Sequence, residues 1–141
     1  MRTFKTFGLL CLLASGVAVA QAATPASSAA TPPQAKVAEL MTKALKDYPG
    51  KEALMITVVY PPGAVDPVHR HNAHAFVYVL EGSIVMGLKG GKEVTLTPGQ
   101  TFYEGPDDVH TVGRNASQTK PAKFLVLLLK NQGEPVLRLE P

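Results

Sequence analysis

The chain of 141 residues is long enough for one domain preceded by a short leader. Its hydrophobic fraction of 45% is that of a globular protein. No stretch has the ~20 consecutive apolar residues of a transmembrane helix, so we expect no membrane partner for the mature protein. The formal charge of +3 is small and, as shown next, partly belongs to the leader.

Residues 1–22 have the features of a secretory signal peptide. Arg2 and Lys5 form a positive n-region, an apolar run covers residues 7–19, and small residues between Ala18 and Ala22 supply a cleavage site. Cleavage removes these two cations and none of the 11 acidic residues, so the charge falls from +3 to +1. Nucleic acid is therefore not an expected partner. We expect a periplasmic or secreted protein.

The only cysteine, Cys11, lies within this leader. The mature chain therefore has neither a disulfide nor a cysteine that could act as nucleophile or metal ligand. Any metal site in it must be built from histidine, carboxylate or other oxygen donors.

Two segments precede the part of the chain that is rich in predicted strands. Residues 23–34 are small, polar and proline-rich, which predicts a disordered linker. In residues 35–48 the apolar positions follow the period of an amphipathic helix, which Pro49-Gly50 ends. These positions are Val37, Leu40, Met41, Ala44 and Leu45. We expect one N-terminal helix that packs on a barrel wall or covers a sheet edge, with a partner-binding helix as the alternative.

From Ala53 onward, segments rich in β-branched and aromatic residues alternate with turns. Strands are predicted over Ala53–Tyr60, Ala75–Leu80, Ser83–Lys89, Glu93–Thr97, Thr101–Glu104, Val109–Gly113, Lys123–Lys130 and Val136–Leu139. Many short strands without intervening helices predict an all-β sandwich or barrel. Both parities of residues 76–80 are apolar, so we expect the helix or a second subunit to cover the barrel from outside, and hence a homodimer.

Three of the four histidines, His69, His71 and His74, lie within six residues. On an extended strand, side chains two apart leave the same face, so His69 and His71 form a pair that suits a divalent transition metal. His110 lies in a turn that leads into a second extended segment. A sheet that folds back on itself would bring His110 to the pair. The histidines therefore predict a metal held inside a small β-barrel.

Two stretches around these histidines resemble the paired motifs of the cupin superfamily. Gly63, His69, His71 and Gly82 fall in register with the first motif, G-x5-H-x-H-x3/4-E-x6-G, and Ala75 stands where the glutamate belongs. The second motif, G-x5-P-x-G-x2-H-x3-N, is matched at Gly99 and His110, with an altered middle and Asn115 one position late. The resemblance covers roughly residues 53–130 of a domain expected over 35–141.

This resemblance implies a jelly-roll barrel that holds a metal on three histidines and usually a glutamate. Carried over position by position, His69, His71 and His110 are the ligands. Ala75 cannot bind a metal, so the fourth ligand stays open. His74 reaches the site only if Asn72-Ala73 forms a bulge. Glu104, in an aromatic stretch before His110, is a candidate fourth ligand or general base.

If neither residue serves, three histidines alone hold the metal, and water or substrate fills the open positions. The expected cofactor is one divalent transition metal, Fe, Cu, Ni, Mn or Zn, and the expected partner is a small molecule. Because some cupins that activate dioxygen use a three-histidine site, the resemblance implies a dioxygenase-type enzyme.

Three other functions remain as alternatives to a dioxygenase. They are a redox-neutral isomerase or lyase with a Lewis-acid metal, a non-catalytic periplasmic module that binds a small ligand or metal, and a metal-free structural barrel. Few basic residues lie near the motifs, which disfavours a sugar phosphate and favours a small, mostly apolar substrate.

Overall fold

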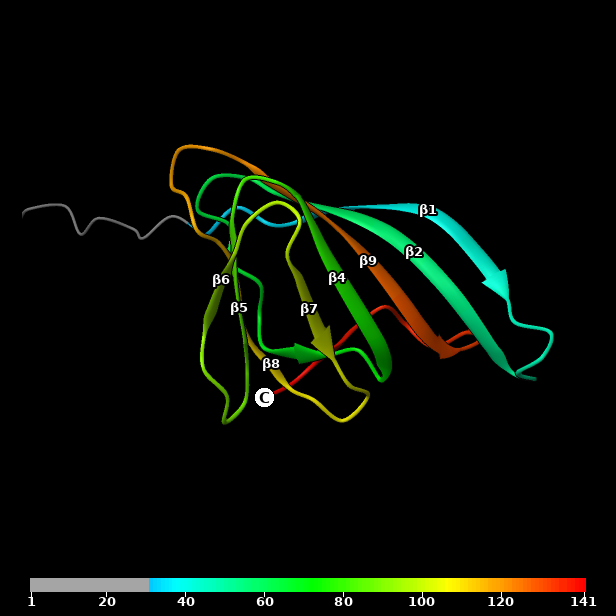
Figure 1. Cartoon of the computed structure of the whole chain (residues 1–141). Coiled ribbons are helices and arrows are strands. Elements are labelled where there is room, and N and C mark those ends of the chain that lie inside the picture. Colours follow the sequence, from blue (N-terminus) through cyan, green and yellow to red (C-terminus); the bar gives the residue numbers. More distant parts are fainter. Residues whose placement is uncertain (1–30) are drawn as a thin grey trace, which may run out of the picture.

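The computed structural model describes residues 31–141, which fold into two five-stranded antiparallel sheets (Figure 1). The strands are β1 (Lys36–Ala44), β2 (Lys51–Tyr60), β3 (His69–Arg70), β4 (Ala73–Glu81), β5 (Ile84–Leu88), β6 (Val94–Leu96), β7 (Thr101–Glu104), β8 (His110–Asn115), β9 (Ala122–Asn131) and β10 (Arg138–Leu139). Sheet A has the order β1-β2-β9-β4-β7, and sheet B the order β10-β3-β8-β5-β6.

The all-β prediction is confirmed, and the described residues contain no helix. This part of the chain therefore has no helix that could cross a bilayer. The signal peptide expected over residues 1–22 lies outside the described residues. Of the linker expected over 23–34, only residues 31–34 are described, and they are exposed and without regular structure.

The core lies between the two sheets because the central strands alternate between buried and exposed side chains. In β4, Val77 and Val79 point inward, whereas Phe76 and Tyr78 are exposed on the outer face of sheet A. This alternation with period two is what a strand with one buried face requires. The largest fully buried side chains come from both sheets and include Tyr60, Ile84, Met86 and Leu128.

The helix predicted over residues 35–48 is wrong, because Lys36–Ala44 forms strand β1. This strand pairs with β2 from Lys36↔Val59 to Ala44↔Glu52, with an irregularity between Glu39 and Met41. Without β1, the outer backbone groups of β2 would lack ladder partners, and the pairing satisfies them. Four of the five apolar residues that suggested a helix are exposed, Leu40 at 55% for example, and Leu45 is half-buried. The weak helical period was thus overridden by antiparallel pairing with the next strand in the chain.

The second glycine of the first motif is explained by the turn after β4. Gly82 has a φ of +70°, and a Cβ on it would lie 2.5 Å from the carbonyl oxygen of Pro121. Only glycine fits both the backbone conformation and the close approach of the other chain segment. This turn sets β5 on its return path into sheet B.

Candidate metal site

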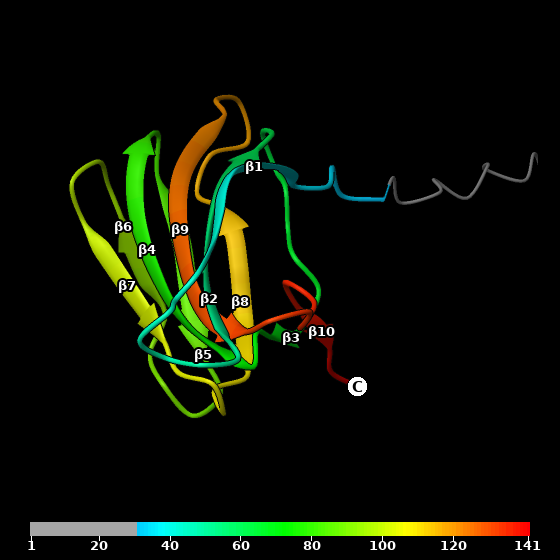
Figure 2. The ribbon, with the colours of Figure 1, turned by 90° about the vertical axis from the view of Figure 1, so that its right-hand side faces the viewer.

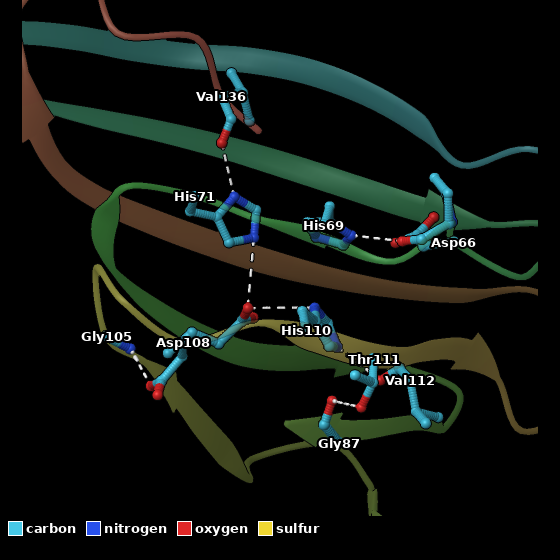
Figure 3. Close-up of polar contacts among 12 residues, drawn as sticks. Asp66, His69, His71, Gly87, Gly105, Asp108, His110, Thr111, Val112 and Val136 are labelled. Carbon is cyan, nitrogen blue, oxygen red and sulfur yellow. Dashed lines mark hydrogen bonds and ion pairs between the residues drawn. The ribbon is translucent and has the colours of Figure 1, made fainter. Parts of the chain in front are cut away.

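Three histidines and one glutamate meet inside the barrel, and Figure 3 shows the histidines His69, His71 and His110 close together. His69 in β3 and His110 at the start of β8 are direct cross-strand partners. His71 follows β3, and Glu104 ends β7. One donor atom from each of the four side chains lies within 4.8 Å of every other. His69, Glu104 and His110 are buried, and His71 is half-buried.

Glu104 owes its place to the register between β4 and β7. Ala75 of β4 and Glu104 of β7 are cross-strand partners. Side chains directly opposite on neighbouring antiparallel strands share a face, so the Glu104 carboxylate enters the barrel beside position 75. Ala75 is fully buried, and its methyl group leaves space there. The neighbouring strand thus supplies a carboxylate beside the position where the motif has its glutamate.

One nitrogen of each clustered histidine is held by a backbone carbonyl. His69 Nδ1 lies 2.8 Å from Pro67 O, His71 Nδ1 2.7 Å from Val136 O, and His110 Nε2 2.6 Å from Val112 O. A carbonyl oxygen only accepts, so each of these nitrogens carries the hydrogen. In the neutral ring, the other nitrogen has a free lone pair. Metal-binding histidines are oriented in this way.

The free donor atoms converge on the Glu104 carboxylate. His110 Nδ1 and His71 Nε2 lie 3.2 and 3.5 Å from Glu104 Oε2. Glu104 Oε2 and His110 Nδ1 are buried, and neither has hydrogen-bond geometry to any described group. Lone pairs of neutral imidazoles that face a buried carboxylate require a cation among them. The donor set of three nitrogens and one oxygen fits a divalent transition metal.

The electrostatics of the cluster keep Glu104 ionised. Burial would raise the pKa of Glu104, but the adjacent His110 imidazole, together with His71 and His69, outweighs burial and lowers that pKa. Burial would lower the pKa of His110, but Glu104 outweighs it and raises it. Burial lowers the pKa of His69, and the two neighbouring histidines add to this effect despite the Pro67 carbonyl. Without a metal, a proton on His110 is the available cation.

A cavity of about 80 Å³ adjoins the cluster. Its walls are mostly apolar side chains of β2 and β9, namely Ile56, Val58, Phe124 and Val126. Since a water molecule needs roughly 10–15 Å³ of cavity volume, the cavity has room for about six water molecules. It therefore suits a small molecule rather than a sugar phosphate.

The structure does not bring His74 to the cluster. His74 is exposed on the outer face of sheet A, and its Nδ1 lies 2.7 Å from the Tyr103 hydroxyl. It pairs regularly with Leu129 of β9, and the irregularity of β4 lies further on, between Val79 and Glu81. Strand parity therefore directs His74 away from the barrel interior.

Sequence reasoning missed a second polar group in the cavity, formed by Tyr60 and Asp66. The Tyr60 hydroxyl donates a hydrogen bond to Asp66, and both residues line the cavity. Burial and the neighbouring Asp66 carboxylate raise the pKa of Tyr60, so the hydroxyl stays protonated. The available signal was an acidic residue three positions before His69 in a strand-connecting loop.

Comparison with known proteins places these features in one family. The family model described as "Cupin domain" matches residues 56–128, which include all four clustered residues. None of the curated proteins matches the chain.

Solved structures share the fold at low sequence identity. A cupin domain from Bordetella pertussis is 20% identical, with a TM-score of 0.57 over 72% of this chain and 99% of that one. An oxalate oxidase in complex with the substrate analogue glycolate is 23% identical, with a TM-score of 0.57 over 74% and 54% of the chains. The DMSP lyase DddQ from Ruegeria pomeroyi is 24% identical, with a TM-score of 0.54, and 62% of this chain spans only 42% of that protein.

Proposed function

Since the chain belongs to the cupin family, we propose that it binds one divalent transition metal on His69, His71, His110 and Glu104 and is an enzyme for a small molecule. The observation that carries this proposal is the pair of buried atoms, Glu104 Oε2 and His110 Nδ1, that face each other without a hydrogen bond. Their neighbours His69 and His71 are oriented by backbone carbonyls in the manner of metal ligands.

Within this proposal Glu104 serves as a ligand rather than as a general base. Its Oε2 faces His71 and His110 at once, so it lies inside the donor set and not beside it. A bound metal would supply Lewis acidity or a redox centre. The protein supplies one carboxylate charge, three oriented imidazoles and apolar walls that limit water around the substrate.

We propose oxygen-dependent chemistry as the first candidate reaction. An apolar cavity directly beside the cluster offers dioxygen, an apolar gas, a place to bind. The structural neighbours include an oxalate oxidase and a DMSP lyase, so the fold accommodates both oxidative and lyase reactions. A redox-neutral lyase or isomerase is therefore the second candidate.

Metal content tests the site. Mature protein purified from its native source, without added metal or affinity tag, should contain about one equivalent by elemental analysis. His69→Ala, His71→Ala and His110→Ala should each lose the metal with the fold kept, and Glu104→Gln should bind it roughly 10–100-fold more weakly. His74→Ala is the matched control and should bind as the unchanged protein does. Full metal content in the three cluster histidine variants would contradict the site.

Metal identity separates the candidate reactions. Iron, copper, nickel or manganese would lead to oxygen-consumption assays with small organic acids and phenols. Zinc would favour the redox-neutral reaction or a binding role. A protein that contains no metal and takes none up on titration would be a metal-free barrel, and the proposed enzyme function would fall.

We also propose a homodimer formed through the outer face of sheet A. The exposed aromatic residues Phe76, Tyr78 and Tyr103 lie together there, and strand β1 is exposed along its whole length. Exposed apolar patches of this kind mark interfaces. Light scattering should give a dimer mass that Phe76→Lys reduces to a monomer. Val94→Lys, on the other sheet, is the control, and a monomeric unchanged protein would refute the proposal.

The location proposed for the mature protein is the periplasm or the exterior of the cell. Its basis is the sequence of residues 1–22, which lie outside the described part. Intact mass and N-terminal sequencing of the natural protein should show that the chain begins near residue 23. A natural protein that retains Met1 and its apolar run would contradict this location.

A further inference from the structure

Two polar residues, Tyr60 and Asp66, line the cavity beside the four candidate metal ligands, and neither belongs to that donor set. Tyr60 is only 1% exposed and ends strand β2. Its hydroxyl donates to Asp66 Oδ2, and the backbone N–H of Asp66 donates to Gly113 O at 2.8 Å. The carboxylate of Asp66 is therefore fixed in place through both its side chain and its backbone.

Gly113 lies where the Tyr60–Asp66 pair approaches His110 of the candidate metal site. A Cβ on Gly113 would lie 3.1 Å from the Tyr60 hydroxyl, 3.3 Å from Asp66 Oδ2 and 3.2 Å from His110 Cε1. These three groups thus surround the space of one missing methyl group. A molecule small enough for the cavity can therefore contact a metal held by the histidine and glutamate side chains and, at the same time, Asp66.

The cavity is lined by carboxylates and by no Lys or Arg side chain. The only acidic residues that line it are Glu104 and Asp66. Glu104 is one of the candidate metal ligands. Asp66 also lines the adjoining surface groove, whose lining residues likewise include no Lys or Arg. An ionised carboxylate accepts several hydrogen bonds, of which Tyr60 supplies one. Asp66 therefore favours a hydrogen-bond donor or a cation and repels a second anionic group.

We propose that Asp66, positioned by Tyr60, determines the substrate class of this site. The inference rests on the proposed metal site, where a divalent ion with one carboxylate ligand keeps a net positive charge. The substrate it assigns is a small carboxylate with a hydroxyl or, better, an ammonium group at its other end. A dicarboxylate, whose second charge would face Asp66, is disfavoured.

Three probes of equal size and different end groups test this assignment. Butyrate, 3-hydroxypropionate and β-alanine differ only in a terminal methyl, hydroxyl or ammonium group. Their binding to the Co(II)-loaded protein is measured by calorimetry and by the visible spectrum of the metal. We expect β-alanine to bind about tenfold more tightly than butyrate, with 3-hydroxypropionate between them.

Two conservative variants and one control complete the test. Asp66→Asn should bring the ratio of β-alanine to butyrate affinity close to one, and Tyr60→Phe should reduce it in part, both with unchanged Co(II) content. Asp107→Asn, an exposed acid in a turn, should leave the ratio as it is. Equal or absent binding of the probes by the loaded protein, or a ratio that Asp66→Asn retains, would overturn the assignment. Failure of the protein to bind Co(II) would overturn the metal site and this inference together.

Discussion

At the scale of single residues, the arrangement of the site depends on which of two paired positions carries a carboxylate. Ala75 and Glu104 face each other across β4 and β7, and both side chains are buried. The family motif has its glutamate at the first of these positions. Glu104 places the same functional group there from the neighbouring strand, so the missing motif residue does not reduce the set of donors.

An exchange of the two residues tests whether they are equivalent. Glu104→Ala should weaken metal binding about 10–100-fold, and the double variant Ala75→Glu/Glu104→Ala should regain most of it, because the carboxylate returns to the same space. Ala75→Glu alone should destabilise the fold by a few kcal/mol, on the order of the cost of an unpaired buried charge. Metal titration and urea unfolding measure these effects. A double variant no better than Glu104→Ala would show that the two positions are not interchangeable.

The proton on His110 gives a second test in metal-free protein. Burial alone lowers the pKa of His110, and Glu104 raises it above the ordinary 6.5. A raised pKa stabilises the fold fully below pH 6.5, and this contribution is lost as pH rises through the pKa of the folded state. In Glu104→Gln the pKa of His110 should fall, as an NMR titration after chelation would show. An unchanged pKa of His110 in this variant would contradict the coupling.

At the scale of elements, the C-terminal segment after β9 is part of the site. In Figure 2, β10 lies beside β3, with which it pairs through Leu139↔His69. Arg70 Nε lies 2.7 Å from Glu140 Oε1, and Asn72 Nδ2 donates to Glu134 Oε1 at 2.9 Å. These contacts hold the Val136 carbonyl against His71 Nδ1. A segment far along the chain thus orients one residue of the candidate site and forms part of the cavity wall.

Removal of this segment should therefore affect the metal more than the fold. A chain truncated after Asn131 keeps β1 to β9 but leaves His71 without its carbonyl partner. Loss of a partner that orients a ligand weakens metal binding roughly 10–100-fold. Metal titration measures this change, circular dichroism verifies the fold, and deletion of Pro141 alone is the control. An unchanged metal affinity would show that Val136 does not orient His71.

At the scale of the whole molecule, the proposed metal site joins both sheets. Sheet B contributes His69 and His110, sheet A contributes Glu104, and the loop between β3 and β4 contributes His71. In the unfolded chain these residues are far apart, so a metal bound by all four stabilises the folded state. Metal removal should for this reason act on the stability of the entire domain.

Thermal unfolding with and without metal measures this coupling. At a free metal concentration about 100 times Kd, binding adds about 2.7 kcal/mol, which raises Tm by roughly 10 °C for a domain of this size. The gain should decrease from pH 7.5 to 5.5, because protons compete with the metal for the imidazoles. Glu104→Gln should show a smaller gain at either pH. A Tm unaffected by metal would contradict a site that spans both sheets.

Much of the fold and part of the site could be predicted from local patterns. The β-branched and aromatic residues of β4 and the glycine-rich turns identify strands, since both depend on neighbours within a few residues. The two-residue spacing of His69 and His71 likewise indicates a shared face. The clustering of His110 with them agrees with the family motif, and the fold brings it there through the β3–β8 pairing.

Tertiary structure alone decided which segments pair. The periodicity of residues 35–48 favoured a helix, but pairing with the edge of the next strand, β2, made Lys36–Ala44 a strand. Glu104 was one of three alternatives until the β4–β7 register placed it opposite Ala75. The Val136 carbonyl and the Tyr60–Asp66 pair reach the site through loops and strands far apart in the chain. Local sequence determines which residues can form strands, whereas the identity of a cross-strand partner depends on the packing of the whole chain.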